Sequence, residues 1–419
     1  MPAHSSFQFH AIPAGLLPEA SRYLIQAAAW FQGWLYLGVT SYPADLTHPG
    51  NTVLLRHRLR ESGWERLHAS TVESRWFMHQ GQSRYFPLEL GWRALAVLPS
   101  TKQPAPALYA LRFSLRAPAL LYSEEGAHFT EIASSPDTDG SPFINLRSFS
   151  GQIFAISARA AHTGRNGPLI WVSTGPCAQS WHPACTPGFG NPENRTIDGL
   201  HVFNGQLYAV AGNPTNGFQL WKTMARGQPP FTWEPVLAEG AQRYTLNPHV
   251  EALTVFKDML YLGTRSPHPD PRWEFATSGA EVIRVLANGH WELVTGTPRF
   301  SPVGLQIPLS AQGPGFSGHR NRRVSRLMGT PNALYAALDH YEDPVNANPT
   351  SEPVNFQLWK SQDGEEWEVV TSDSFGQPAA TRLRVLQPTP HGLAVTGDWD
   401  LTRDPKAQPG IWLERSHLE

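Results

Sequence analysis

The amino-acid sequence predicts an all-β protein, a seven-bladed β-propeller with four antiparallel strands in each blade and a ring closed by an N-terminal strand. Two observations carry this prediction. The 419 residues include 38 prolines and 35 glycines spread along the chain, which favours short strands and tight turns over long helices. In addition, a unit of strand, turn, strand, loop, strand, turn and strand recurs seven times at a mean spacing of about 60 residues, the signature of a repeat architecture.

The clearest unit lies in the middle of the chain. Apolar runs at residues 200–203 and 206–211 flank Asn204-Gly205, a strong β-hairpin signal because both central residues of a type I′ turn need positive φ. Residues 217–222 and 233–237 follow as the third and fourth strands. An aromatic residue opens the fourth strand in several units, at Trp64, Phe129, Trp233, Trp291 and Trp367. We interpret these rings as packing between blades.

The remaining units follow in order along a single domain, residues 1–419. The predicted blades span about residues 22–70, 92–134, 143–185, 197–238, 249–296, 323–372 and 381–415. The last unit ends after its third strand. The alternating segment 7–12 is the expected donor of the missing strand, pairing beside residues 411–414 and covering an edge that would otherwise be free.

Short motifs add a family resemblance. The motifs are Phe256 with Leu260 to Thr264, Gly217 to Lys222, Ser361 to Trp367, and Gly188-Phe189-Gly190. Together they resemble bacterial seven-bladed propeller repeat proteins. The Ser361-Gln362-Asp363-Gly364 stretch is similar to a shortened Asp-box of sialidase-like propellers, and Ser123 to Phe129 is a weaker copy. The resemblance implies the fold rather than an activity, and we interpret Asp363 and Glu125 as turn-capping residues.

Composition and charge exclude several classes of function. The 33 basic and 35 acidic residues give a net charge of −2, so neither nucleic acid nor an anionic membrane surface is an expected partner. No apolar run approaches the ~20 residues needed to cross a bilayer, and no secretory signal is apparent, so we expect a cytoplasmic protein. We also expect a monomer, because ring closure hides the sheet edges.

The two cysteines, Cys177 and Cys185, lie in one Pro-rich loop. Two free thiols are the favoured interpretation in a cytoplasmic protein. A loop-closing disulfide is the main alternative. A metal pair with His182 is a third, although zinc would need a further ligand.

Function is expected in the longest loops, which emerge on one face of a propeller. Insertions occur between blades and within blades, at residues 71–91, 175–197 and 296–322, and at 41–51, 266–280 and 339–355. Loops raised on a rigid scaffold are where binding and catalytic groups concentrate.

Acids, histidines and arginines gather in these loops and at the start of the first strands. The candidate catalytic residues are His249, Glu251, His340, Tyr341 and Asp398. The candidate substrate-binding residues are Arg265, Arg323, Arg382, Trp399 and Trp76. The candidate metal ligands are His268, Asp339, Asp343 and Asp400.

Three interpretations of these groups stay open. They form a solvated loop surface, a site for a divalent transition metal or calcium, or an acid-base set with His249 or His340 as base and Tyr341 as proton donor. Arginines would hold an anionic substrate or pair with acids of neighbouring blades.

Two function classes follow. The first is a funnel that binds a small polar molecule, anionic or carbohydrate-like, with lyase, isomerase or hydrolase chemistry slightly favoured over binding alone. The second is a protein-interaction scaffold or lectin-like binder that uses aromatic loops. No linear catalytic motif decides between them.

Overall fold

A computed structural model describes most of the chain, in two compact units. The described residues are 6–42, 51–59, 63–69, 75–79, 82–86, 89–99, 105–114, 119–134, 143–157, 167–175, 181–267, 279–318, 320–339 and 355–415. The central unit comprises Ala158–Trp171 and His182–Gly376. The terminal unit comprises Pro2–Ser157, Val172–Trp181 and Gln377–Glu419. The boundary passes through β14 (Ile170–Ser173).

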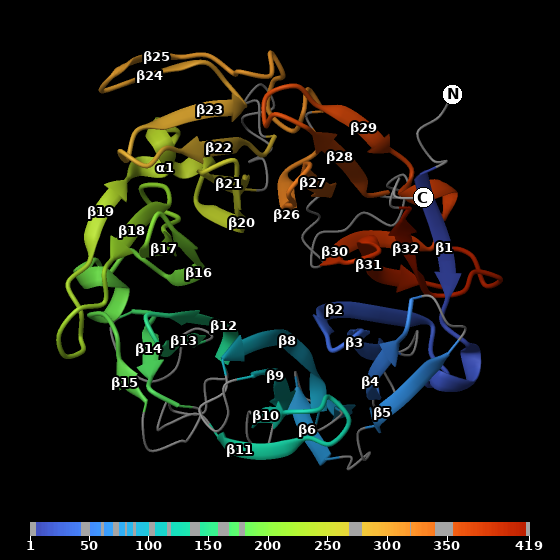
Figure 1. Ribbon diagram of the computed structural model, residues 1–419. Helices are drawn as coiled ribbons and strands as arrows, with labels where there is room; N and C mark the ends of the chain where they lie inside the picture. Colours follow the sequence, from blue (N-terminus) through green and yellow to red (C-terminus); the bar gives the residue numbers. More distant parts are fainter. Residues whose placement is uncertain are drawn as a thin grey trace. The chain divides into compact units, whose positions relative to one another are not determined.

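The central unit contains three successive antiparallel groups of four strands (Figure 1). The first group is β16 (Thr196–Phe203), β17 (Gln206–Gly212), β18 (Gln219–Thr223) and β19 (Glu234–Leu237). The second is β20 (His249–Phe256), β21 (Met259–Arg265), β22 (Val282–Val285) and β23 (Trp291–Thr295). The third is β26 (Arg323–Gly329), β27 (Leu334–Asp339), β28 (Gln357–Ser361) and β29 (Glu368–Thr371). The first strands of these groups are neighbours, β16 beside β20 and β20 beside β26.

The connections of the central unit contain shorter elements. They are β15 (His182–Pro183), η4 (Pro187–Gly190), α1 (Glu239–Gln242), η5 (Tyr244–Leu246), β24 (Arg299–Ser301), β25 (Gly304–Gln306) and η7 (Ser374–Gly376).

The terminal unit brings both ends of the described chain into one sheet. Its first strands are β1 (Phe7–Ala11), β2 (Arg22–Phe31), β3 (Trp34–Tyr42), β4 (Thr52–His57) and β5 (Trp64–Ala69), with η2 (Ala14–Leu16) after β1. The last strands, β30 (Ala380–Thr389), β31 (Gly392–Asp400) and β32 (Gly410–Glu414), join the same sheet. The predicted pairing of the N-terminal strand is confirmed, because β1 runs antiparallel to β32 from Phe7 opposite Glu414 to Ala11 opposite Gly410.

The rest of the terminal unit follows β5. It consists of a hairpin of β6 (Arg75–His79) and β7 (Gln82–Phe86), then β8 (Glu89–Pro99), β9 (Pro106–Ser114), β10 (Ala119–Ser123) and β11 (Thr130–Ser134), and then β12 (Phe143–Phe149) with β13 (Gln152–Ser157). The β6–β7 hairpin and the β24–β25 hairpin correct the expectation that residues 71–91 and 296–322 are plain loops. Both hairpins are short, and neither has the Asn-Gly or Asp-Gly turn that would predict a hairpin from sequence.

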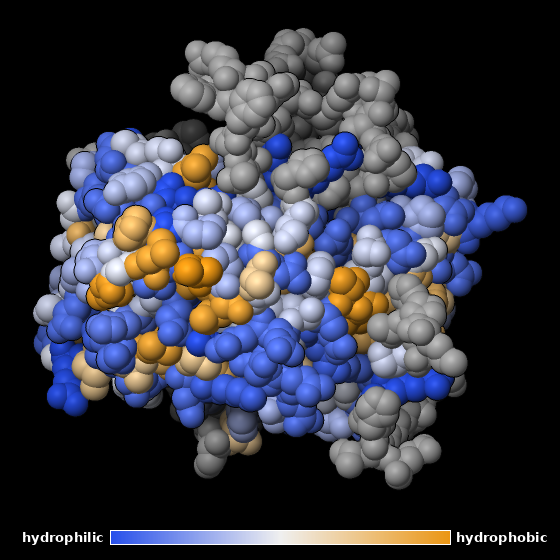
Figure 2. All heavy atoms as spheres, turned by 90° about the horizontal axis from the view of Figure 1, so that it is seen from above, coloured by the Kyte–Doolittle hydropathy of each residue, from blue (hydrophilic) through white to orange (hydrophobic). Residues whose placement is uncertain are grey.

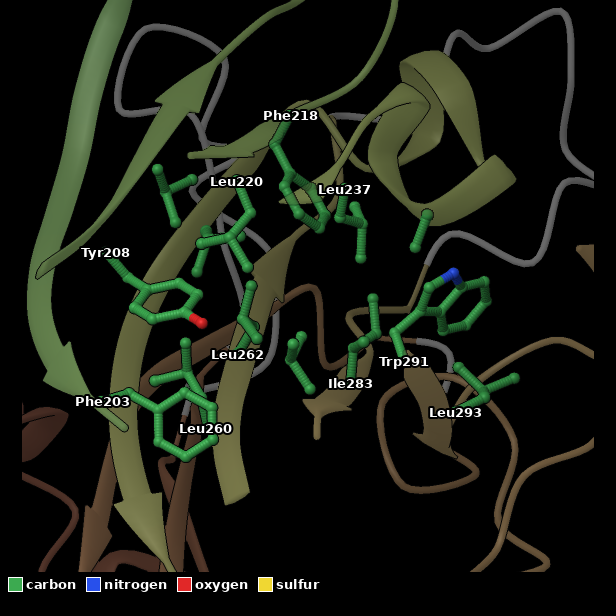
Figure 3. Close-up of a cluster of buried hydrophobic side chains, with 14 residues drawn as sticks. Phe203, Tyr208, Phe218, Leu220, Leu237, Leu260, Leu262, Ile283, Trp291 and Leu293 are labelled. Carbon is green, nitrogen blue, oxygen red and sulfur yellow. The ribbon is translucent and has the colours of Figure 1, made fainter. Parts of the chain in front are cut away.

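Second strands are buried on both faces, which explains why they are continuous apolar runs in the sequence. Six of the seven residues of β17 are buried, and five of the seven in β21, whereas β20 alternates between buried and partly exposed residues. Side chains of the first two central sheets form one hydrophobic cluster (Figure 3). Its largest members include Phe203, Tyr208, Phe218, Leu220, Leu260, Leu262, Ile283, Trp291 and Leu293. Burying each such side chain contributes about 1.5–3 kcal/mol.

The strand registers align one row of residues in four groups of strands. The row places a tyrosine of the second strand beside a cation of the third, which lies beside a glutamate of the fourth. The rows are Tyr36–Arg56–Glu65, Tyr208–Lys222–Glu234, Tyr261–Arg284–Glu292 and Tyr335–Lys360–Glu368. The recurring Leu-Tyr of the sequence is therefore one part of a three-strand contact.

The structure shows which side chains cap the two predicted turns, around Asp363 and around Glu125. Asp363 Oδ1 accepts hydrogen bonds from the backbone N–H groups of Glu365 and Glu366, both at 2.8 Å. Gly364 has a φ of +89°, and a Cβ there would collide with the hydroxyl of Tyr261. In the weaker copy it is Ser123 Oγ that caps the turn, accepting the N–H of Gly126 at 2.8 Å.

Candidate functional site

Every first strand carries a β-bulge close to the same position among the described residues. In β16 the bulged residue is Asp198, in β20 it is Glu251, and in β26 it is Ser325. The corresponding residues of the terminal unit are Gln26, Arg93, Ile144 and Arg384. A bulge re-aims its side chain and is common next to functional sites. Six of these seven residues are polar, so the first strands present a repeated set of polar groups.

In the central unit, two neighbouring first strands join Asp198 to His249. The Nδ1 atom of His249 lies 3.1 Å from Asp198 Oδ2, and both side chains are mostly buried, at 13% and 11% exposed. Asp198 also accepts the N–H of Val250 at 3.1 Å and the hydroxyl of Thr196 at 2.5 Å. Gly212 leaves room for this contact, because a Cβ at residue 212 would collide with the side chains of Thr196, His249 and Asp198.

This contact sets the tautomer of His249. An aspartate at Nδ1 holds the proton on that nitrogen and leaves Nε2 as the basic atom. Within the described part of the chain, no hydrogen bond reaches His249 Nε2. The pair is therefore arranged as a general base is in enzymes, with an orienting acid behind an imidazole.

Glu251 is neutralised by two arginines. Arg323 Nη2 lies 2.8 Å from Glu251 Oε2, and Arg265 Nη1 lies 3.0 Å from Oε1. Burial alone would raise the pKa of Glu251, but the charges of Arg323 and Arg265 and the hydrogen bond from Arg323 hold that pKa below its usual range. Glu251 is thus an ionised partner of both arginines at neutral pH; Arg323 comes from β26 of the next strand group, whereas Arg265 comes from β21, beside the strand of Glu251.

Asp339 ends β27 opposite Arg323. Its carboxylate is almost completely buried, and Oδ1 lies 4.0 Å from Arg323 Nε. Among the residues that the structure describes, no three His, Cys, Asp or Glu side chains converge as metal ligands do. Two of the four predicted metal ligands, His268 and Asp343, lie outside the described residues.

In the terminal unit, Asp398 forms an ion pair with the bulged Arg384, with 3.0 Å between Oδ2 and Nε. Arg382 lies opposite Asp398 in the β30–β31 register. Asp400 pairs with Arg22 at 3.3 Å and accepts the N–H and hydroxyl of Thr402 in a turn. Asp398 and Asp400 are thus both held by protein partners within the unit.

Trp399 is placed differently from the expectation. The ring is 1% exposed and stacks on Trp412 with centroids 5.4 Å apart and planes at 10°. Phe9 of β1 packs against both rings. Trp399 therefore belongs to the core of the sheet that β1 completes, which corrects its assignment as a substrate contact. The sequence pattern predicts Trp399 and Asp400 in a loop, whereas β31 extends through both residues.

Other predicted residues are outside the described part of the chain. His340, Tyr341 and Cys177 lie there, and Trp76 belongs to β6 without a described side chain. Cys185 is a free, buried thiol, and burial raises its pKa to about 12.

Asp198 is the main residue that sequence reasoning missed. It had a signal: an apolar residue, a polar residue and a small residue recur as Ile-Asp-Gly, Val-Glu-Ala, Ile-Gln-Ala and Trp-Arg-Ala in four first strands. The bulge lies at the polar residue of this triplet, which has no partner in the strand register.

Comparisons with known proteins identify the fold only. No family model matches the chain, and no curated protein is similar to it in sequence. An ancestral GH74 enzyme is similar in structure, with 11% identity, a TM-score of 0.53, and coverage of 95% of this chain and 48% of that one. A polysaccharide lyase has 11% identity, a TM-score of 0.50 and coverage of 98% and 92%. The GH93 α-L-arabinofuranosidase of Fusarium graminearum with arabinobiose has 10% identity, a TM-score of 0.46 and coverage of 86% and 98%.

The class that fold and comparisons define is an all-β protein of propeller-like antiparallel sheets. This chain spans about half the length of the GH74 enzyme. None of the described helices is long and apolar enough to cross a bilayer.

Proposed function

We propose that the chain is a seven-bladed propeller enzyme whose first-strand bulges in the central unit bind a polar, hydroxyl-rich small molecule and whose His249 moves a proton. The observation that carries the proposal is the Asp198–His249 pair, in which a bulge brings an orienting carboxylate to an imidazole whose Nε2 remains available. Such a base typically contributes about 10²–10⁴-fold to a rate.

The charges around His249 favour a hydroxyl-rich ligand over a strongly anionic one. Arg265 and Arg323 both face Glu251, so their charge is largely compensated inside the protein. Carboxylate and guanidinium groups held in place by such pairs still offer acceptors and donors to hydroxyl groups. Two of the similar structures bear the names of a polysaccharide lyase and a GH74 enzyme, and carbohydrate is accordingly the first substrate class to test.

The chemistry open to His249 Nε2 is removal of a proton. Abstraction of a carbon-bound proton next to a carboxyl group would give elimination or isomerisation, and abstraction from water would give hydrolysis. Asp198 stabilises the imidazolium that forms in either case, because its carboxylate lies at Nδ1. In elimination and in hydrolysis the proton then passes from Nε2 to the departing oxygen, and in isomerisation it returns from Nε2 to another carbon of the same molecule.

The test is a screen of neutral and uronic-acid oligosaccharides, with mass spectrometry separating an elimination product from a hydrolysis product. The H249A variant should lose turnover, and D198N should lower kcat by about 10²–10⁴-fold because it no longer holds the required tautomer. The matched control is H290A, which removes an exposed histidine of a turn in the same unit. Turnover by H249A within about threefold of the wild-type rate would eliminate His249 as the base.

The seven-blade count has its own test. Support comes from the recurring bulge of the first strands and from the pairing of β1 with β32. An experimental structure with another blade number, or with an open ring, would contradict this part of the proposal and leave the Asp198–His249 chemistry to be judged by its kinetics.

A further inference from the structure

A hairpin beside β23 exposes a concentrated apolar surface. Nine large apolar side chains are exposed among the described residues, and five of them lie between residues 300 and 309. These five are Phe300 (76% exposed), Val303 (62%), Leu305 (53%), Ile307 (61%) and Leu309 (40%). Figure 2 shows a band of hydrophobic side chains on the corresponding face, where Figure 1 places β24 and β25.

The register of the hairpin puts the apolar groups on one side. Phe300 of β24 lies directly opposite Leu305 of β25, so both side chains point the same way. Ile307 follows Leu305 by two residues, the spacing that keeps a side chain on the same face of an extended chain. Arg299 and Gln306 form the neighbouring pair and point to the other face. We call the surface of Phe300, Val303, Leu305, Ile307 and Leu309 the hairpin face.

The opposite side of the hairpin is anchored by a buried ion network. Arg299 donates two hydrogen bonds of 2.9 Å to the two oxygens of Glu281, whose side chain is fully buried. Arg299 Nε also donates to the carbonyl of Ala241 at 2.6 Å. Arg243 Nε lies 3.4 Å from Glu281. Such a bidentate contact has a specific geometry, so it orients the hairpin against Glu281.

The charge of the segment indicates what covers it. Residues 295–318 contain one charged residue, Arg299, and it is used inside the protein. A face without charge meets no repulsion when a twofold axis places it against its own copy, as a symmetric interface requires. An anionic lipid surface would need basic residues beside the apolar ones, and this segment has none to offer.

The area also fits self-association. At ~150–200 Å² for each fully exposed side chain, the five groups present roughly 500 Å² of apolar surface, large for a monomer. Two copies face to face would bury about 1,000 Å², the lower limit for a specific interface.

We propose that the hairpin face is a dimer interface, in which a second copy of this chain packs against it around a twofold axis. The inference does not depend on the proposed enzyme function. The proposed dimer differs from the expected monomer, because that expectation was based on the sheet edges alone and left the 296–322 insertion out of account. Buried area alone does not set the affinity of such a dimer, so its dissociation constant is left to the concentration series below.

The test is sedimentation velocity of the full chain from about 1 to about 200 µM. The wild type should shift from monomer to dimer, and F300D should stay monomeric with an unchanged melting temperature, because the side chain is mostly exposed. The matched control is V369D, which places the same charge at a 40% exposed valine outside the hairpin and should dimerise normally.

A charge-swap experiment identifies the occupant. L305D and L305K should each be monomeric alone, and an equal mixture should recover the dimer because the two faces then carry opposite charges. A wild-type monomer at every concentration overturns the proposal, as does a dimer that F300D leaves intact. Binding to neutral lipid vesicles by a monomeric wild type, lost in F300D, would overturn it in favour of a membrane surface.

Discussion

The buried carboxylate of Glu281 should contribute far more to stability than an exposed carboxylate. Three loops of the central unit share one arrangement, in which an asparagine side chain donates to a glycine carbonyl and to an acceptor on the next sheet. The sets are Asn194 with Gly188 and Gln219, Asn247 with Gly240 and Glu281, and Asn321 with Gly315 and Gln357. Only the middle acceptor of these three is charged.

The informative change is therefore E281Q. Glutamine preserves the shape and the hydrogen bond from Asn247, as it does in the other two loops, but leaves Arg243 and Arg299 without their shared counter-charge. Removing one partner of a buried ion pair costs about 3–5 kcal/mol. If the whole chain unfolds cooperatively, an unfolding entropy of ~2.1 cal/mol/K per residue converts this loss into about 3–6 °C in Tm.

Calorimetry at one protein concentration measures the effect. The control is E65Q, which breaks a 2.6 Å pair with Arg56 at a glutamate side chain that is 47% exposed. An exposed pair contributes at most about 1 kcal/mol, so E65Q should shift Tm by ~1 °C or less. Adding R299M to E281Q should recover part of the loss, because one uncompensated charge disappears. Equal melting of E281Q and E65Q would refute the reasoning.

Three further outcomes are expected. Deleting residues 1–15 should lower Tm by about 5 °C, because it removes β1 and the buried Ile12, whereas deleting residues 1–5 should not; equal melting of both truncations in calorimetry would contradict the β1–β32 pairing. Cys185 should resist iodoacetamide at pH 8.5 until urea is added, as followed by peptide mass spectrometry. Burial raises the pKa of this thiol from 9.0 to about 12, so the folded state favours the neutral thiol. The free energy of unfolding that this preference contributes is complete below pH 9 and is lost as the pH rises from 9 to 12. Finally, D363A should cost about 1 kcal/mol in a urea titration without changing turnover, and a loss of turnover would show that the turn is part of the site.

The fold could be predicted wherever local chemistry determines geometry. Asn204 and Gly205 have φ values of +46° and +68°, as their hairpin turn requires. The donor strand was found by counting strands, since a unit without a fourth strand needs one from elsewhere. His249 and Glu251 were found because polar residues interrupt an apolar first strand.

The site was predictable only in part, because a bulge is a property of pairing between two strands. Asp198 is unpaired since Ile197 and Gly199 face consecutive residues of β17, and nothing in β16 alone reports this. The hairpin face was missed for a related reason. Phe300 and Leu305 lie in a Pro-rich stretch in which only Leu305-Gln306-Ile307 alternates, and nothing local in the sequence reports that Arg299, on the other face of the hairpin, pairs with the distant Glu281.

The pairing of β1 with β32 has a consequence for synthesis. The two strands are separated by about 400 residues, so β1 leaves the ribosome long before its partner β32 does. At 5–20 residues per second that interval is roughly 20–80 s. During it, residues 7–11 are an alternating strand without a partner, and the rings of Trp399 and Trp412 do not yet exist to cover Phe9. During this interval the nascent chain therefore has to be kept from associating with its neighbours.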